Sequence, residues 1–359
     1  MMRLPSKTKC KDWLINFSFV VPFLLFYLAF IVYPVIQAIL MSFYDWQLLG
    51  NAPVWLGLDN YLKMFGGQNI EWSLNAQWFV RLLLLSFAIY WAWRTRKTRN
   101  AGDIALMVSL LLIVLLMGFH PGEHGSWNDP RFWNAFKNTV VFTVVSTPII
   151  AGLGLAFALL LNNPRRKTNG LYRAALFLPY VLPVSVATLI WGYLLNPSRG
   201  LVGRLSEILG REPIAWLSDP RFAMGAIIVT TVWWTVGFNM ILFGAGLQDI
   251  DPALYEAAQL DGASKWQQFR HITLPGLSHV SLLIMVTQII ASFQIFGQVN
   301  IMTGGGPGNT TDVVVRYIYQ TGFRDMQLGY ASAMSLFLFV VMVLVSLIQF
   351  LMSRERKAQ

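Results

Sequence analysis

The chain has 359 residues, of which 55% are hydrophobic and 12% are charged. Soluble domains carry about 25% charged residues, so this composition excludes a pair of soluble domains and predicts an integral membrane protein surrounded by lipid. The net charge of +10 does not indicate nucleic-acid binding, because Lys and Arg form short clusters between apolar runs and no continuous basic stripe. The single cysteine, Cys10, has no partner for a disulfide.

The first apolar run, at 17–40, follows a basic tail at 1–16. It is longer than the apolar core of a signal peptide, which has about 7–15 residues, so we expect a retained transmembrane helix. Five further runs are long enough to cross a bilayer as helices of about 20 residues. They lie at 135–161, 171–195, 222–247, 280–302 and 329–352.

Two shorter apolar runs, at 78–93 and 104–119, flank the basic sequence RTRKTRN. Each would be about 24 Å long as a helix, against a hydrocarbon core of about 30 Å. If this pair did not cross, the basic cluster would lie on the outer side, against the positive-inside rule. We therefore predict an inserted transmembrane hairpin at 78–119.

The predicted fold class is an all-α integral membrane protein, a polytopic bundle of about eight transmembrane helices with a six-helix core and the inserted hairpin. Both termini are expected in the cytoplasm, because that orientation places more Lys and Arg in the inner segments than in the outer ones. The core is expected at 132–352, with a cytoplasmic loop at 248–278 inside it and a cytoplasmic tail at 353–359.

A polar block, PALYEAAQLDGASKWQQFRHITLP at 252–275, interrupts the apolar runs. Its start predicts a short helix, because Asp251 can cap a helix whose first residue is Pro252. Glu256 lies early enough in this helix to interact favourably with the helix dipole. Gly262 can end the helix in a left-handed conformation.

The rest of the block predicts a second short helix. Ser264 and Gln267 have the spacing of a capping box, which begins a helix through 265–273. Pro275 marks a bend into the next apolar run. From the pattern alone, an ordinary amphipathic loop between two membrane helices remains an alternative.

The residues of the first short helix also resemble a known motif. Glu256, Ala257 and Ala258, followed at fixed spacing by Gly262 and the sequence ITLP, resemble the EAA motif of binding-protein-dependent ABC importer permeases. In that family the short helix docks in a cleft of the ATPase subunit. The resemblance implies that these four residues couple ATP-driven closure to movement of the membrane helices. Small Ala side chains permit close docking, and Glu256 can meet a cationic group on the partner.

Other stretches resemble the carbohydrate branch of that family, whose members are similar to the maltose transporter. These stretches are VPFLLFYLAFIVYPVIQAILMSFYDW, LYRAALFLPYVLPVSVATLIWGYLLNP and NIMTGGGPGNTTDVVVRYIYQTGF. The resemblance covers the first helix and nearly everything after Phe132. Residues 70–120 lie outside the usual six-helix pattern and are similar in helix count to the eight-helix permease of the maltose system.

The chain contains no Gly-Lys dipeptide and therefore no P-loop for ATP. It is thus expected to be no enzyme and to hold no cofactor, with ATP and Mg²⁺ bound by two partner ATPase subunits. The resemblance also implies a second, different permease subunit and an extracytoplasmic solute-binding protein. We expect an inner-membrane location and a carbohydrate or polyol as cargo, with glycerol phosphate or another small solute as the alternative.

Polar side chains at membrane depth indicate a translocation path, because they tend to face a cavity or a partner. Aromatic rings stack on the apolar face of a sugar, and hydroxyls and amides match its OH groups. An alternative is that these groups only join helices, at about 0.6 kcal/mol each. The candidate pathway residues are Thr231, Trp234, Thr235 and Phe238 on one helix and Gln288 and Ser292 on another.

A different class of function, a membrane metalloenzyme, would use the sequence HPGEH at His120–His124, which matches an H-x-x-E-H zinc pattern. That chemistry needs both His residues on one helical face, and Pro121 and Gly122 disfavour a helix there. A solvated outer loop is the preferred interpretation. The Gly-rich sequence at 304–308 is most simply an outer turn.

Overall fold

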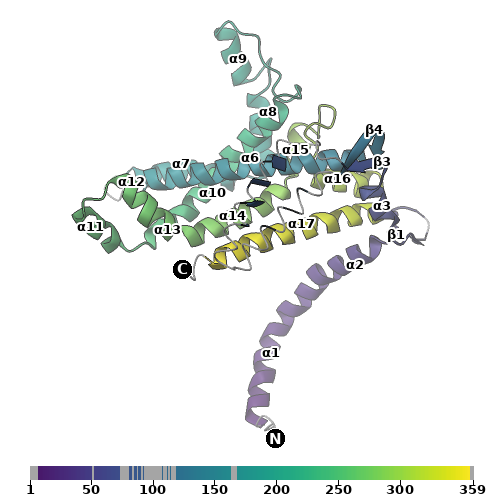
Figure 1. Cartoon of the computed structure of the whole chain (residues 1–359), viewed down its shortest axis with the longest axis horizontal. Helices are drawn as coiled ribbons and strands as arrows, with labels where there is room; N and C mark the ends of the chain where they lie inside the picture. The colour runs from purple at the N-terminus through teal and green to yellow at the C-terminus, as the bar shows by residue number, and fades with distance from the viewer. Residues whose placement is uncertain are drawn as a thin grey trace. The chain divides into compact units, whose positions relative to one another are not determined.

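The computed structural model describes residues 7–50, 52–72, 119–162 and 168–355, together with isolated positions between 81 and 114 (Figure 1). The chain divides into two compact units. The first contains Met1–Met64 and Ile318–Phe337, and the second contains Phe65–Tyr317 and Leu338–Gln359. The predicted hairpin at 78–119 lies almost entirely outside the described residues and stays a prediction.

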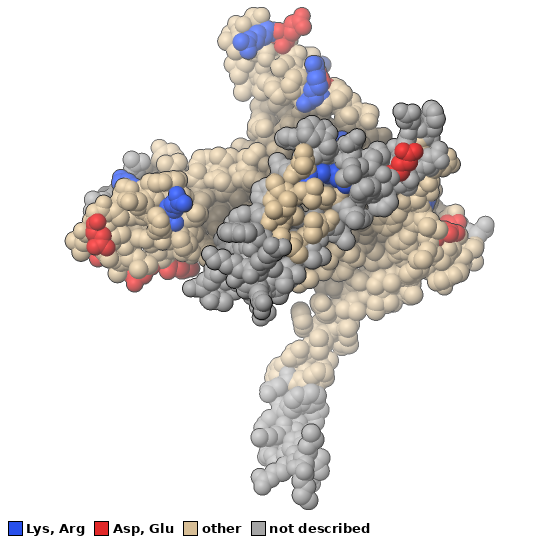
Figure 2. All heavy atoms as spheres, viewed as in Figure 1, with Lys and Arg blue, Asp and Glu red and all other residues tan. Residues whose placement is uncertain are grey.

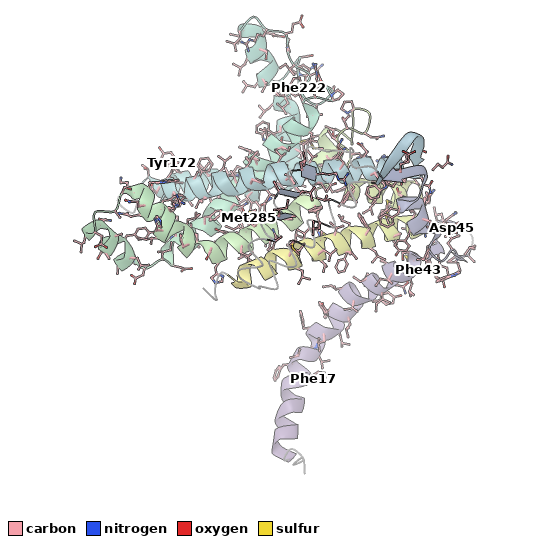
Figure 3. The ribbon with its side chains drawn as sticks, viewed as in Figure 1. Phe17, Phe43, Asp45, Tyr172, Phe222 and Met285 are labelled. Carbon is pink, nitrogen blue, oxygen red and sulfur yellow. The ribbon has the colours of Figure 1, made fainter. Side chains whose placement is uncertain are left out.

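The first unit begins with a long apolar helix. It runs through α1 (Lys7–Tyr27), the π-helical segment η1 (Leu28–Val32) and α2 (Tyr33–Met41). The π segment lies just before Pro34. The ring of a proline clashes with the carbonyl one turn earlier, and its nitrogen has no N–H to donate a helical hydrogen bond, so the preceding turn widens. In Figure 3 the side chains of this helix that are drawn, Phe17 among them, point away from the helix axis. Within the first unit, its apolar span buries no residue.

Short elements follow this helix within the first unit. Strand β1 (Tyr44–Asp45) pairs antiparallel with β2 (Val54–Trp55), and α3 (Asp59–Phe65) comes next. Asn60 on α3 donates from Nδ2 to the carbonyls of Ser42 and Tyr44, at 2.9 and 3.1 Å. These bonds satisfy the backbone where α2 turns into β1.

The second unit is a helical bundle with a two-stranded sheet at its start. Strands β3 (Gly67–Trp72) and β4 (Phe119–Trp127) pair antiparallel. The membrane-length helices are α6 (Pro130–Leu160), α10 (Ala223–Gln248) and α14 (Ser278–Phe293) with α15 (Gly297–Met302). The remaining elements are α7 (Asn169–Val181), α8 (Val184–Leu194), α9 (Leu201–Ile208), α11 (Pro252–Leu260), α12 (Lys265–Gln268), η2 (Phe269–Thr273) and α13 (Leu274–Gly276). After these come α16 (Val314–Tyr319), η3 (Gln320–Arg324) and α17 (Leu328–Glu355). Of this stretch, residues 318–337 belong to the first unit.

Among the described residues, five helices are long and apolar enough to cross a membrane, at Phe17–Met41, Pro130–Leu160, Ala223–Gln248, Ser278–Met302 and Leu328–Gln349. They coincide with five of the six long spans predicted from the sequence. Together with the broken pair α7 and α8, they give up to six spans in the described part of the chain. Figure 2 shows charged side chains around α11 and α12 and around α9, with a few more elsewhere on this face.

The predicted span at 171–195 is broken into two helices. Helices α7 and α8 meet at an angle of 100°. Between them Leu182 is extended, with ψ 139°, and Pro183 follows. Proline pushes the preceding residue out of the helical region and cannot donate a helical hydrogen bond, so the chain leaves α7 and begins a new helix.

Helices α6, α7, α10 and α14 pack side by side around two apolar clusters. Close approach of α10 to α7 requires Gly237, because a Cβ there would lie 2.0 Å from the carbonyl oxygen of Leu176. One cluster lies toward the end of α10 that leads into α11 and contains Met240, Phe243, Leu247, Leu277 and Ile284, with Ala158 and Ile250. The other lies toward the start of α10 and contains Phe142, Ile227, Ile228, Ile295, Val299 and Val313.

A buried charge cluster holds the start of α6 against the loop before α16. The Asp312 side chain is fully buried and accepts from Arg131 at 2.9 Å and from Arg316 at 2.8 Å. Nearby, Tyr317 donates to Asp129 at 2.7 Å. The Gly-rich segment at 304–308 forms a turn whose ends are joined by a 2.8 Å hydrogen bond between Thr303 and Thr311.

Candidate functional site

The polar block forms an exposed structure that we name the coupling segment, residues 251–277. Asp251 caps α11 by accepting from the backbone N–H of Ala253 at 2.9 Å, and Pro252 occupies the first turn, as predicted. At the other end, Gly262 is left-handed with φ +75°. Its N–H donates to the Gln259 carbonyl at 3.1 Å, and the N–H of Ala263 donates to the Ala258 carbonyl at 2.9 Å. This pair of bonds is a Schellman motif, which depends on the left-handed residue.

The second half of the segment begins with the predicted capping box. The Gln267 side chain accepts from the Ser264 N–H at 2.7 Å, and the Ser264 hydroxyl accepts from the Gln267 N–H at 3.3 Å. The helix then continues through η2 and α13, with Pro275 inside this helical path. The π turn of η2 accommodates the missing N–H of Pro275, and the helical path is interrupted two residues after this proline. A one-residue turn at Leu277 separates α13 from α14.

One side of the coupling segment is fixed to the bundle. Tyr255 shares a 2.9 Å hydrogen bond with the hydroxyl of Thr273, which ties α11 to η2. Tyr255 and Ile272 pack against the apolar cluster around Leu247 and Leu277. These contacts hold the segment in one orientation at the end of α10.

The opposite side of the segment faces outward. Glu256, Ala257 and Gly262 are exposed, and Ala258 is half-buried. Large apolar side chains accompany them, with Leu260 90% and Trp266 67% exposed. Exposed apolar side chains beside small and charged residues are typical of a protein interface.

The four candidate pathway residues of α10 form two kinds of interaction. Trp234 donates from Nε1 to the Leu182 carbonyl at 3.0 Å, in the break between α7 and α8. Phe238 stacks on Tyr180 with ring centroids 4.6 Å apart, and the Tyr180 and Trp234 centroids are 6.1 Å apart. Thr231 and Thr235 each donate to a carbonyl of their own helix, at 2.9 and 2.7 Å. The aromatic residues thus form a half-exposed cluster at the helix break.

The candidate residues of α14 belong to a second, buried polar network. Gln288 accepts from Asn239 on α10 at 3.2 Å and donates to Ser292 at 3.4 Å. Ser292 in turn shares a 3.3 Å hydrogen bond with Thr147 on α6. The network links three helices, and it includes Asn239, which the sequence reasoning missed although an Asn within an apolar span is a signal in itself.

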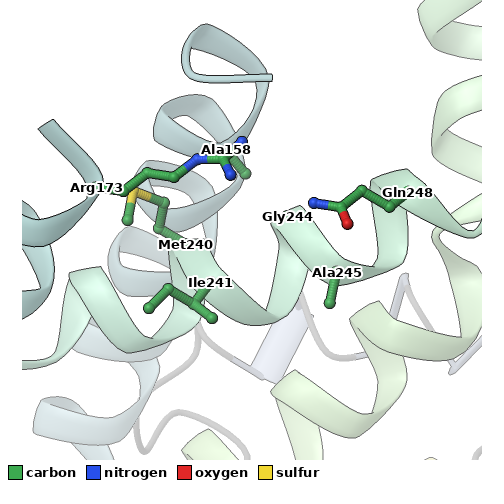
Figure 4. A pocket seen from close by; sticks show the side chains of 7 residues that line it. All are labelled: Ala158, Arg173, Met240, Ile241, Gly244, Ala245 and Gln248. Atoms are coloured by element: carbon green, nitrogen blue, oxygen red, sulfur yellow. The ribbon is translucent and has the colours of Figure 1, made fainter. Parts of the chain in front are cut away.

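A cavity of about 160 Å³ lies further along α10, toward the coupling segment (Figure 4). It is lined by Ala158, Arg173, Met240, Ile241, Gly244, Ala245 and Gln248. No candidate pathway residue lines it, and ligand pockets usually measure about 300–1,000 Å³. Arg173 there donates to the Leu161 carbonyl at 2.8 Å and so caps the end of α6. The cavity is therefore not a sugar site by itself.

The zinc alternative fails on backbone geometry. His120 and His124 lie on strand β4, paired with β3, and not on a helix or in the expected solvated loop. The strand does not supply the helical face on which this zinc pattern places both ligands. The described residues contain no cluster of three or more His, Cys, Asp or Glu that could hold a metal.

The sequence of this chain is similar to those of known transport proteins. Residues 149–357 match the family described as "Binding-protein-dependent transport system inner membrane component". The lactose transport system permease protein LacF of Rhizobium radiobacter is 39% identical over 236 residues, which cover 64% of this chain and 79% of that protein. The sn-glycerol-3-phosphate transport system permease protein UgpA of Agrobacterium fabrum is 34% identical over 232 residues, covering 64% and 78%.

A solved bacterial ABC transporter involved in the import of the acidic polysaccharide alginate shares the fold. A chain of that structure superimposes with a TM-score of 0.68 at 22% sequence identity, covering 97% of this chain and 98% of its own length.

Proposed function

We propose, from the premise that this chain belongs to the family of binding-protein-dependent transport system inner membrane components, that it carries a carbohydrate or polyol across the cell inner membrane. In this function the chain is the permease subunit of an ABC importer and contributes no ATPase of its own. The observation that carries the choice of cargo is the aromatic cluster at the break between α7 and α8. The 39% identical lactose permease supports the same class.

The pathway proposal assigns different roles to the two groups of residues. Trp234 and Phe238, together with Tyr180, offer ring faces for stacking on a sugar. Gln288 and Ser292, together with Asn239, offer amide and hydroxyl groups that exchange their mutual hydrogen bonds for bonds to sugar hydroxyls. The hydroxyls of Thr231 and Thr235 already donate to their own helix, so they contribute acceptor positions only.

The coupling segment is proposed to dock on an ATPase subunit, which binds ATP and Mg²⁺. Glu256, Ala257, Ala258 and Gly262 lie on or beside its outward side, and the exposed Leu260 and Trp266 need a protein cover. One such segment serves one ATPase subunit. We therefore include a second permease chain, two ATPase subunits and an extracytoplasmic solute-binding protein in the complex.

The proposed topology has eight transmembrane helices, with both termini in the cytoplasm. It combines the spans of the described residues with the hairpin at 78–119. The basic cluster between the two arms of that hairpin supports it through the positive-inside rule.

The second candidate cargo, glycerol phosphate, is favoured by the 34% identity to a glycerol-phosphate permease. Reconstituted importer with its solute-binding protein tests the choice. A panel of saccharides, polyols and glycerol phosphate is added in turn, and ATP hydrolysis and uptake into vesicles are measured. We expect a saccharide or polyol to stimulate both, and stimulation by the phosphate ester alone would contradict the carbohydrate assignment.

A further inference from the structure

The cavity near the end of α10 contains a guanidinium group with unused donors. Arg173 on α7 lines this cavity, and its hydrogen bond within the described part of the chain runs from Nη2 to the Leu161 carbonyl at 2.8 Å. A guanidinium carries several N–H donors in a planar fork, so the others on Arg173 lack an acceptor among the described residues. Arg131, Arg221 and Arg316 differ, because each pairs with an aspartate. A half-buried arginine without a carboxylate is available for an anion from outside the chain.

The hollow exists because α10 presents small residues there. Ile241, Gly244, Ala245 and Gln248 recur at i, i+3, i+4 and i+7, on one face of the helix. A Cβ added at Gly244 would meet no atom within 4 Å. The cavity volume of about 160 Å³ is about ten times the space of about 10–15 Å³ that one water needs. A group of several atoms, such as a phosphate, therefore fits.

The lining combines a polar end with apolar walls. In Figure 4 the Arg173 side chain and the Gln248 amide extend toward each other across the cavity. Ala158, Met240 and Ile241 contribute apolar surface, and Ile241 is 41% exposed. A free phosphate gains nothing from this apolar surface. An acyl chain attached to the phosphate gains free energy with each CH₂ group that it buries there.

The charge of the surrounding chain is positive. The cavity lies between the stretch 161–173 and the end of α10 with the residues after it, 241–251. The first stretch has four basic residues and no acidic one, and the second has Asp249 and Asp251 and no basic one. Four positive and two negative charges give a sum of +2. Asp251 caps α11, and Asp249 is not among the described ion-pair partners of Arg173.

The position of the cavity along α10 matches the headgroup region of a bilayer. The cavity follows Met240–Gln248, about 12 Å of helix at 1.5 Å per residue, and α10 ends there and leads into the coupling segment. In the proposed topology this end lies at the cytoplasmic surface. The cytoplasmic leaflet holds anionic lipids, and basic pockets between membrane helices on that side bind their headgroups.

We propose that this cavity binds the headgroup phosphate of an anionic phospholipid from the cytoplasmic leaflet. Arg173 donates its unused N–H groups to the phosphate oxygens, Gln248 adds an amide donor, and an acyl chain lies along Ile241. Because Arg173 also caps the end of α6, the bound lipid joins α6, α7 and α10 next to the coupling segment. The choice of leaflet rests on the proposed topology, and the site does not depend on the identity of the cargo.

Gly244→Leu tests the site by filling the cavity while Arg173 and its bond to Leu161 remain. Gly225→Leu is the matched control, because Gly225 lies on the same helix, does not line the cavity, and has no atom within 4 Å of an added Cβ. Arg173→Gln removes the positive charge. The complete importer is purified in detergent and stripped of lipid, and its binding of phosphatidylglycerol is measured by native mass spectrometry. Phosphatidylcholine is a second ligand, and inorganic phosphate is added as a competitor.

We expect the wild-type importer to bind phosphatidylglycerol more tightly than phosphatidylcholine. The affinity for phosphatidylglycerol should fall about tenfold or more in Arg173→Gln, because one charge-assisted hydrogen bond is worth at least that factor. Gly244→Leu should show a similar loss, and Gly225→Leu should bind like the wild type.

Four results would overturn the proposal. Wild-type affinity in Gly244→Leu would exclude the cavity as the site, and an equal loss in Gly225→Leu would show that the effect is not local. Equal binding of phosphatidylcholine would show that the site does not select an anion. Inorganic phosphate that displaces the lipid at a similar concentration would assign the site to a free anion. Cargo uptake is measured separately, so a failure of the carbohydrate assignment would leave this comparison unchanged.

Discussion

Gly262 offers the sharpest test of the coupling segment, because its requirement is conformational and not steric. A Cβ added there meets no atom within 4 Å, yet the residue has φ +75°. A left-handed conformation costs an L-residue about 1–2 kcal/mol, and a β-branched residue is disfavoured further. Gly262→Val therefore opposes the Schellman bonds of Gly262 and Ala263 and turns α12 away from α11.

A graded series separates this strain from other effects. Asn tolerates the left-handed region better than other residues, so Gly262→Asn serves as the matched control for Gly262→Ala and Gly262→Val. A factor of about 5–30 in the population of the native turn corresponds to 1–2 kcal/mol. We expect stimulated ATP hydrolysis and co-purification of the ATPase subunit to fall in the order Gly, Asn, Ala, Val.

The measurement uses the complex reconstituted in vesicles with loaded solute-binding protein. Membrane insertion should be the same for all four proteins, because the turn lies outside the membrane helices. Equal docking, hydrolysis and uptake by Gly262→Val and the wild type would refute the reasoning, since the turn would then have no part in coupling.

Glu256→Lys reverses an exposed charge in the middle of α11, beyond the first turn where the expected interaction with the helix dipole acts, so a loss of ATPase co-purification indicates a partner contact, and normal co-purification argues against one. Trp234→Ala and Gln288→Ala should lower uptake in vesicles while the ATPase still co-purifies; normal uptake by both would assign these residues to packing alone. Asp312→Asn removes the buried carboxylate that pairs with two arginines and should destabilise the complex by about 3–5 kcal/mol, seen as a lower midpoint of thermal unfolding in detergent, whereas an unchanged midpoint would mean that the cluster contributes little. A reporter enzyme fused after Arg99 should register as cytoplasmic, and a periplasmic signal would contradict the hairpin at 78–119.

The coupling segment was predictable because each of its signals acts over a few residues. The Asp251 side chain accepts from a backbone N–H two positions away. Gly262 and Ser264 each form a hydrogen bond with a residue three positions away. Such capping patterns can be predicted from neighbouring residues without knowledge of the tertiary structure.

The break at Pro183 was not predictable from the proline itself. Pro22 and Pro148 lie inside helices that continue through them, as membrane helices tolerate when neighbouring groups satisfy the backbone. What distinguishes the break is a contact across the fold, the hydrogen bond from Trp234 to the Leu182 carbonyl. The pairing of Asn239 with Gln288, 49 residues apart, escaped prediction for the same reason.

The helical path through α12, η2, α13 and α14 has a mechanical consequence. It runs from Lys265 to Phe293 with one turn residue, Leu277, which is 0% exposed within the apolar cluster. The path therefore consists of two helical arms that meet at Leu277. At about 1.5 Å per residue the arm to Trp266 is about 17 Å long and the arm to Ser292 about 23 Å. If the two arms turned together about Leu277 as rigid bodies, a displacement of about 1 Å at Trp266 would become about 1.4 Å at Ser292, roughly half the length of a hydrogen bond.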